Sequence, residues 1–71
     1  MNAETLRDLL NRRPFEPFEL RLTSGEQHQV RHPENAMLVG ARLVLAYPET
    51  ERIVILSLLH VASIEMLQAA A

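Results

Sequence analysis

Cysteine, tryptophan and lysine are absent from the 71 residues of this chain, and the absence of cysteine excludes the most. It excludes disulfide bonds and the thiolate metal sites typical of structural zinc proteins. A domain this short buries only about 60% of the surface that its unfolded chain exposes, so its core alone gives marginal stability. Small domains gain the remainder from disulfides, metals or association. We therefore expect this chain to be stabilised by association with further copies.

An excess of basic residues is also missing. Seven arginines stand against nine acidic residues, which gives a formal net charge of -2. Proteins that bind duplex DNA usually carry a basic excess, so we expect no duplex DNA partner. Residues 1–8 lack the basic and apolar regions of a signal peptide. The longest apolar run, residues 52–67, is too short and too polar to cross a bilayer. Together with the absence of cysteine, these features predict a cytoplasmic protein with no membrane partner.

Glycine is rare, and catalytic signatures are missing. Gly25 and Gly40 are the two glycines of the sequence, too few for a phosphate-binding glycine loop. None of the serines lies in a nucleophile-elbow sequence. A chain this small also has little room for an enclosed catalytic cleft. We therefore expect a protein that is not an enzyme and that holds no cofactor.

Residues 2–13 have the pattern of a short amphipathic helix. The asparagine at their start is a suitable N-cap. Leu6, Leu9 and Leu10 recur at the spacing of one helix face, and Pro14 ends the helix because a residue before proline avoids the helical region. About three turns are marginal for an isolated helix, so the leucine face must dock on the rest of the chain.

The remaining residues predict a single domain, residues 1–71, that is mostly β with one N-terminal helix. Residues 14–17 form a rigid connector, and Phe15 and Phe18 are expected to seal the core. Residues 18–67 predict a bent sheet or small barrel, in which residues 36–39 are a short apolar piece. The period of two in hydrophobicity gives five strands, at residues 18–23, 27–32, 43–47, 53–56 and 61–66.

The apolar run at residues 52–67 has two interpretations. Ser57, His60 and Ser63 recur at helical spacing, which favours a helix from Leu56 onward. The alternative, which we prefer, is one helical turn at residues 57–60 followed by a strand at 61–66. In that strand Val61, Ser63 and Glu65 would face one side, and Ala62, Ile64 and Met66 the other. The tail, residues 68–71, is expected to be frayed or a helical end.

A helix followed by five short strands, with one helical turn before the last, is the plan of small SH3-like barrels. More narrowly, the chain resembles the Sm-like family and its bacterial RNA-chaperone branch. Residues 22–26 match the family's first hairpin, and residues 33–39 and 59–64 are similar to its two sequence motifs. The resemblance implies a five-stranded Sm-like barrel and an RNA-binding ring.

A second resemblance covers the Arg-Pro-Phe-Glu-Pro-Phe segment at residues 13–18 and the later Leu-Thr-Ser-Gly, His-Pro-Glu and Leu-Leu-His-Val segments. These segments look like those of a group of short bacterial proteins. That likeness implies no activity.

Histidines are the obvious candidate metal ligands. His28 and His32 share one face of a predicted strand but would lie about 13 Å apart, which is too far to bind one ion. A metal would need a bent strand and a third ligand such as His60 or Glu34. We therefore predict no metal site, with the first two histidines as polar residues on the barrel rim. The third is expected to be a hydrogen-bonded residue of the turn.

Two function hypotheses follow from these patterns, with a small metal-binding protein or enzyme as the third. The first is a non-catalytic binding or scaffolding module that forms a homo-oligomer through exposed strand edges. The second is an Sm-like ring that binds single-stranded RNA through arginine and polar side chains. The residues that we select as candidate ligand or RNA contacts are Arg31, His32, Asn35 and His60.

Overall fold

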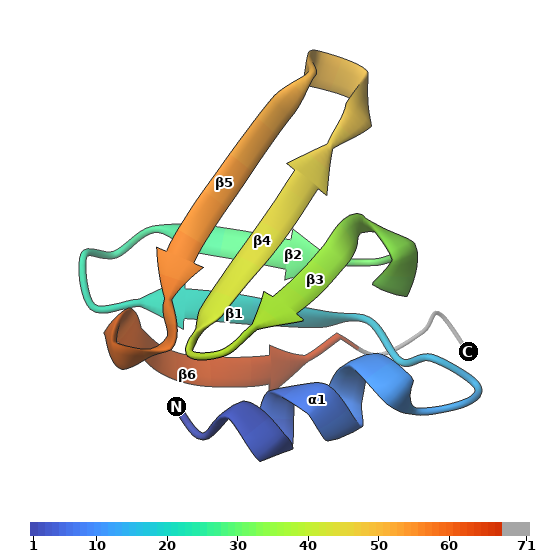
Figure 1. Ribbon diagram of the computed structural model, residues 1–71, viewed down its shortest axis with the longest axis horizontal. Coiled ribbons are helices and arrows are strands. Elements are labelled where there is room, and N and C mark those ends of the chain that lie inside the picture. Colours follow the sequence, from blue (N-terminus) through green and yellow to red (C-terminus); the bar gives the residue numbers. More distant parts are fainter. Residues whose placement is uncertain (68–71) are drawn as a thin grey trace.

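The computed structural model describes residues 1–67, and it consists of one helix and two small antiparallel sheets (Figure 1). The expectation for the tail at residues 68–71 lies outside the described residues. The helix and strands are α1 (Ala3–Asn11), β1 (Phe18–Leu22), β2 (Gln27–Val30), β3 (Ala36–Val39), β4 (Arg42–Tyr47), β5 (Arg52–Ser57) and β6 (Val61–Met66). Single 3-10 turns lie at η1 (Pro33–Asn35), η2 (Pro48–Thr50) and η3 (Leu58–His60).

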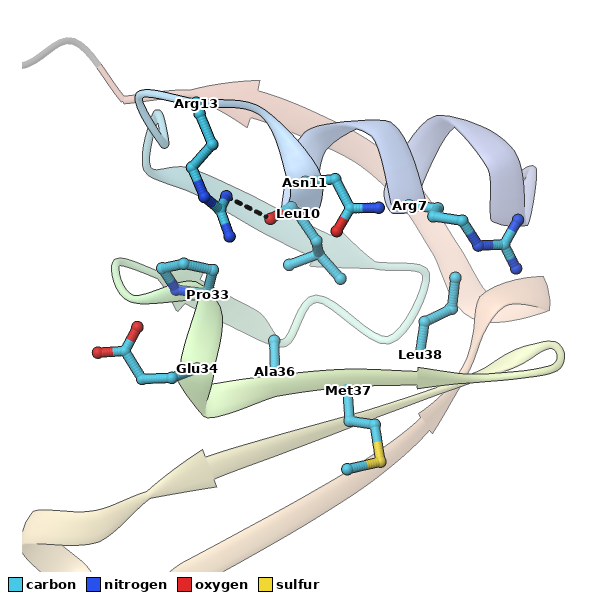
Figure 2. A pocket seen from close by; sticks show the side chains of 9 residues that line it. All are labelled: Arg7, Leu10, Asn11, Arg13, Pro33, Glu34, Ala36, Met37 and Leu38. Atoms are coloured by element: carbon cyan, nitrogen blue, oxygen red, sulfur yellow. Dashed lines mark hydrogen bonds between the residues drawn. The ribbon is translucent and has the colours of Figure 1, made fainter.

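The helix α1 forms with the predicted N-cap but ends at Asn11, two residues before the predicted end at residue 13. The side-chain oxygen of Asn2 accepts a hydrogen bond from the Glu4 amide at 2.7 Å, which satisfies one of the free donors at the start of the helix. Its leucine face, Leu6, Leu9 and Leu10, is buried against the sheets. At the other end, Arg13 Nη1 donates to the Leu10 carbonyl at 3.1 Å (Figure 2). This bond satisfies a carbonyl that the last helical turn leaves free.

The strands form two three-stranded sheets, in the orders β2-β1-β6 and β3-β4-β5. A mostly β fold with one N-terminal helix is therefore confirmed. The count of five strands was wrong, because Ala36–Val39 is itself a strand that pairs with β4 through four residues. Pro33 has no amide hydrogen to donate and begins η1, so the chain between β2 and β3 is interrupted. The two sheets do not close into a barrel in residues 1–67.

The apolar run at residues 52–67 forms a strand, one 3-10 turn and another strand, which confirms the preferred interpretation. Ser57 Oγ accepts from the Leu59 amide at 3.3 Å and so caps the turn. The predicted strict alternation in the last strand was wrong. Leu22 of β1 pairs with Val61 and Leu20 pairs with Ile64, so β6 carries one extra residue, a β-bulge. The bulge allows Val61 and Ile64 to pack on the same core.

One apolar core lies between the helix and the two sheets. Phe18 and Leu20 enter it from the first sheet, and Leu43 and Leu45 enter it from the second. Phe15 packs against Phe18 with the ring centroids 6.0 Å apart, as expected for two residues that seal the helix side. The buried members of the core are Leu6, Leu9, Leu10, Phe18, Leu20, Val30, Leu43, Leu45, Leu56, Leu58 and Val61.

Two adjacent leucines of η3 provide a matched test of this core. Leu58 is 2% exposed and Leu59 is 84% exposed. We expect Leu58→Ala to lower the free energy of unfolding by about 2–5 kcal/mol, because it leaves a cavity in the core. Leu59→Ala is expected to change it by no more than about 0.5 kcal/mol. Urea denaturation measures both, and equal losses in the two variants would contradict the placement of η3.

Candidate functional site

The residues selected from the sequence divide between two hollows. Arg31, His32 and Asn35 line a hollow with a volume of about 230 Å³, which we call the Tyr47 hollow because that ring is part of its wall. His60 lies instead in a hollow of about 410 Å³ beside the β1–β2 turn and the end of β5. The structure therefore brings together three of the four candidate contacts. The Tyr47 hollow is lined by residues Gln29, Val30, Arg31, His32, Asn35, Leu45, Ala46, Tyr47, Pro48 and Glu49.

The Tyr47 hollow is shaped by the break between β2 and β3. The strand β2 ends at Val30, two residues earlier than predicted, and His32 keeps an extended backbone before Pro33 begins η1. The backbone amide of Asn35 donates to the His32 carbonyl at 3.0 Å, so the turn η1 brings Asn35 close to His32. Arg31 Nε donates to Gln29 Oε1 at 3.1 Å, which orients its guanidinium group.

The side chains of this hollow suit recognition of an unstacked base. A guanidinium group and an aromatic ring offer surfaces on which a base can stack. The side-chain amide of Asn35 offers both a hydrogen-bond donor and an acceptor, and the His32 imidazole offers the same pair when neutral. The hollow therefore joins stacking surfaces and hydrogen-bonding groups in one place.

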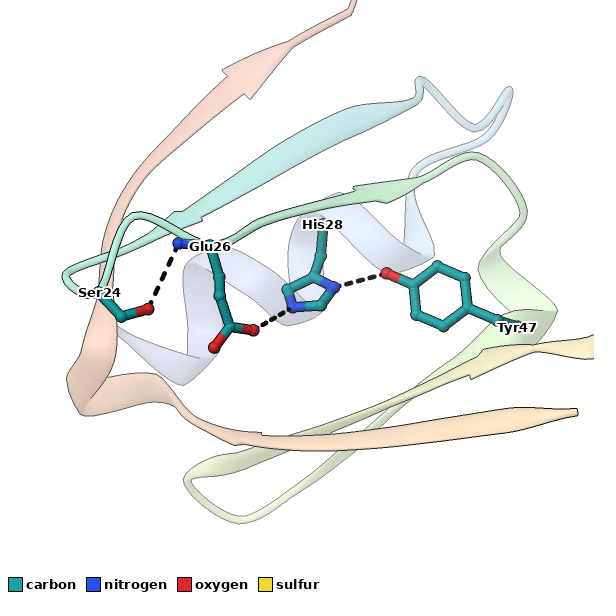
Figure 3. Close-up of polar contacts among 4 residues, drawn as sticks. All are labelled: Ser24, Glu26, His28 and Tyr47. Carbon is teal, nitrogen blue, oxygen red and sulfur yellow. Dashed lines mark hydrogen bonds and ion pairs between the residues drawn. The ribbon is translucent and has the colours of Figure 1, made fainter. Parts of the chain in front are cut away.

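His28 is not a residue of the rim, as the sequence interpretation had it. It is 7% exposed, and its ring lies between the two sheets (Figure 3). His28 Nδ1 lies 2.6 Å from the Tyr47 hydroxyl oxygen, and Nε2 lies 3.2 Å from Glu26 Oε2. Because His28 belongs to β2 and Tyr47 to β4, the hydrogen bond between them connects the first sheet to the second, whereas Glu26 holds His28 from its own side. We call Glu26, His28 and Tyr47 the inter-sheet polar cluster.

The electrostatics of the inter-sheet polar cluster favour a neutral phenol. Burial raises the pKa of the Tyr47 hydroxyl above its ordinary value of 10.0, and the Arg52 guanidinium lowers this pKa by a smaller amount. The guanidinium carbon of Arg52 lies 5.4 Å from the centre of the Tyr47 ring. A phenol with a raised pKa is a poor nucleophile near neutral pH but a good hydrogen-bonding partner. The cluster is therefore suited to holding the two sheets together.

Part of the inter-sheet polar cluster could be predicted from the sequence. The alternation in residues 27–30 places His28 on the same face as the buried Val30, and that placement is correct. His32 was expected on the same face, but β2 ends before it and its side chain is exposed. The contact with Tyr47 was missed because it depends on how two separate sheets face each other, and the sequence pattern within one strand carries no such information.

An exposed apolar face lies on the other side of the second sheet. Met37, Val39, Ile53 and Ile55 are 62%, 55%, 71% and 64% exposed, respectively. Their neighbours in the same strands pack on the core, as the alternation of a half-buried strand requires. Met37 pairs with Val44, which pairs with Ile55, so these side chains form a row across the sheet. We call the set Met37, Val39, Val44, Ala46, Ile53 and Ile55 the outer face.

Within residues 1–67, no three His, Cys, Asp or Glu side chains lie close enough together to hold a metal ion. In the same residues, no helix has the length and apolar character needed to cross a membrane.

The fold and site define a small two-sheet β domain that carries a polar hollow on one side and an apolar outer face on another. No protein-family model matches this chain, and no curated protein or solved structure is similar enough to it to count as a match.

The single tyrosine of the chain makes the inter-sheet polar cluster directly measurable, because no tryptophan interferes. Phenolate absorbance should titrate with a midpoint above pH 10.0, because burial raises the pKa of Tyr47. Arg52→Gln should move that midpoint higher still, since it removes the charge that lowers this pKa. A midpoint at or below the ordinary value in the folded protein would contradict the burial of this ring.

The same group links stability to pH. Because the folded-state pKa of Tyr47 is raised, its contribution to the free energy of unfolding is complete below the unfolded pKa and is lost as the pH rises through the folded pKa. Tyr47→Phe should remove this alkaline loss and should cost about 1–3 kcal/mol at neutral pH, because His28 Nδ1 loses its partner.

Proposed function

We propose that this chain is a non-catalytic binding module that works as a homo-oligomer, assembled through the outer face and the free edge of β5. The observation that carries the proposal is the exposure of Ile53 and Ile55, at 71% and 64%, on the strand at the edge of its sheet. Contiguous exposed apolar patches of this kind mark interaction surfaces. The β4–β5 hairpin also extends past the first sheet, which leaves this edge accessible (Figure 1).

A second copy of the chain is the occupant that this edge fits best. A strand at a sheet edge presents unpaired amide and carbonyl groups, which another strand can satisfy. Antiparallel pairing of β5 with the β5 strand of a second copy, about a two-fold axis at Val54, sets Ile53 opposite the partner's Ile55. Opposed residues in antiparallel strands share a face, so the two outer faces would then be continuous. Such a contact is isologous, and it closes on itself.

The apolar alternation of β5 supports this assignment. Val54 and Leu56 contribute to the core of their own chain, so the fold does not need Ile53 and Ile55 for its packing. A chain of this length gains stability when a partner covers exposed apolar surface. Pairing along β5 would bury the sides of Ile53 and Ile55 that face the partner strand, and it would add backbone hydrogen bonds at the free edge.

The test is the mass in solution of the wild-type chain and the variant I53T/I55T. Threonine keeps the β-branched shape that suits a strand but removes much of the apolar area. We expect sedimentation equilibrium to show a self-associating wild-type protein and a variant whose dissociation constant is at least about tenfold larger.

Leu59→Thr is the matched control, because Leu59 is 84% exposed but does not belong to the outer face. It should leave the dissociation constant nearly unchanged. A wild-type protein that stays monomeric at high concentration would overturn the proposal. So would a control variant that dissociates while I53T/I55T does not.

A second candidate function, an Sm-like ring that binds single-stranded RNA, is favoured by a different observation. Arg31, His32 and Asn35 gather in the Tyr47 hollow, where stacking and hydrogen-bonding groups lie together. The order of helix, strands and 3-10 turn supports this proposal too, with β2 and β3 as two parts of one interrupted strand.

Binding of oligo(U) at low salt tests the RNA hypothesis, because electrostatic attraction is strongest there. Arg31→Ala should weaken binding by roughly tenfold, as expected for loss of a charged hydrogen bond. Arg42→Ala removes the same charge from β4, outside the Tyr47 hollow, and should have a much smaller effect. No binding at low salt, or equal losses in the two variants, would retire this candidate.

A further inference from the structure

A separate hollow lies between α1 and the η1–β3 segment, with a volume of about 460 Å³ (Figure 2). We call it the helix hollow. Its size is within the range of small-molecule sites. None of the four candidate contacts selected from the sequence lines it, and Met37 is the one residue that it shares with the outer face. The lining residues that bear on its chemistry are Arg7, Leu10, Asn11, Arg13, Glu34 and Leu38.

Arg13 is oriented by the main chain. Its Nη1 atom donates to the Leu10 carbonyl at 3.1 Å and to the Arg12 carbonyl at 2.8 Å. Both bonds use the same nitrogen, so the Nε–H and Nη2–H donors have no hydrogen-bond partner in residues 1–67. Those two donors form one edge of the planar guanidinium group, and this edge matches the two oxygens of a carboxylate. The two carbonyls therefore orient the guanidinium group and leave this edge for another acceptor.

The helix hollow has an arginine at each end, an apolar middle and the side-chain amide of Asn11. Figure 2 shows Arg7 and Arg13 at opposite ends, with Leu10 and Leu38 between them. Leu10 belongs to the core and Leu38 packs against it, so this apolar floor is rigid. The Asn11 side chain points into the same space.

The charge of the helix hollow is locally positive in a chain whose formal net charge is -2. Two arginines line it against one carboxylate, that of Glu34. In the described part of the chain, neither Arg7 nor Arg13 has a carboxylate oxygen within ion-pairing distance. An anion entering the hollow would therefore meet guanidinium groups that are not already neutralised.

We propose that the helix hollow binds an elongated organic dicarboxylate. One carboxylate sits on the Nε and Nη2 edge of Arg13, the other sits at Arg7, and the methylene chain lies over Leu10 and Leu38. Glu34 disfavours ligands with further negative charge, and the apolar floor disfavours a ligand that is polar throughout. These two features select a dicarboxylate over a nucleic-acid backbone.

The probes are adipate, suberate and sebacate, with octanoate as the ligand that matches suberate in length but has one carboxylate. Calorimetry gives the affinities, and amide NMR shifts at residues 10–13 and 33–38 locate the site. We expect one dicarboxylate length to bind best, and octanoate to bind about tenfold or more weakly than suberate. Arg13→Gln and Arg7→Gln should each weaken binding of the preferred dicarboxylate by a similar factor.

Glu34→Gln gives a change of opposite sign, because removing the one carboxylate should tighten binding by several-fold. Unfolding of a variant weakens binding and cannot produce this gain. Arg31→Gln, in the Tyr47 hollow, is the control and should leave the affinity unchanged. The proposal is overturned if no dicarboxylate binds, if Arg31→Gln weakens binding as much as Arg13→Gln, or if Arg7 and Arg13 are needed for oligo(U) while suberate fails to compete with it.

Discussion

Burial of a single apolar core between two unclosed sheets is the constraint on which the rest of this structure depends. In residues 1–67 no strand of the first sheet pairs with a strand of the second, so the ladder of backbone hydrogen bonds does not hold the sheets together. Side chains from both sheets meet in the core instead, and the leucine face of α1 covers it. The His28–Tyr47 hydrogen bond, at 2.6 Å, is the polar part of the same connection. A chain this short forms only a small core, so large apolar side chains that remain exposed lower the stability that it could have.

The outer face shows this most clearly on β5. The core includes Val54 and Leu56 but leaves Ile53 and Ile55 exposed on the same strand. The two sides of this strand therefore differ: its inward side chains stabilise the fold, and its outward side chains and free edge are the surfaces on which the proposed association depends. The Tyr47 hollow and the helix hollow lie on either side of the break at η1, where Pro33 and Asn35 redirect the chain. The same interruption that prevents a continuous long strand thus creates the polar surfaces of the molecule.

Local patterns predicted local structure well. Residues 2–13 carried a cap and a leucine stripe and are followed by Pro14, and a helix forms at Ala3–Asn11. The turn at Leu58–His60 and the strand after it were the preferred of two interpretations of residues 52–67, the other being a helix from Leu56 onward. The strand count failed at Ala36–Val39, because what makes this apolar segment a strand is its pairing with β4, which its own residues do not show. The predicted alternation in β6 failed for a related reason, since the extra residue of the β-bulge is defined by the register with β1 and not by the sequence of β6. His32 and Asn35 were found because they flank one bend, whereas Arg13 and Glu34 come to line the same hollow only once α1 has docked on β3.

Hydrogen exchange of the β5 amides at several protein concentrations tests most directly whether this strand serves both the fold and a partner. The account predicts that the amides on the free edge of Arg52–Ser57 exchange more slowly as the protein concentration rises, while amides of α1 keep a constant rate. Rates in β5 that do not depend on concentration, across a range that includes high concentration, would contradict it.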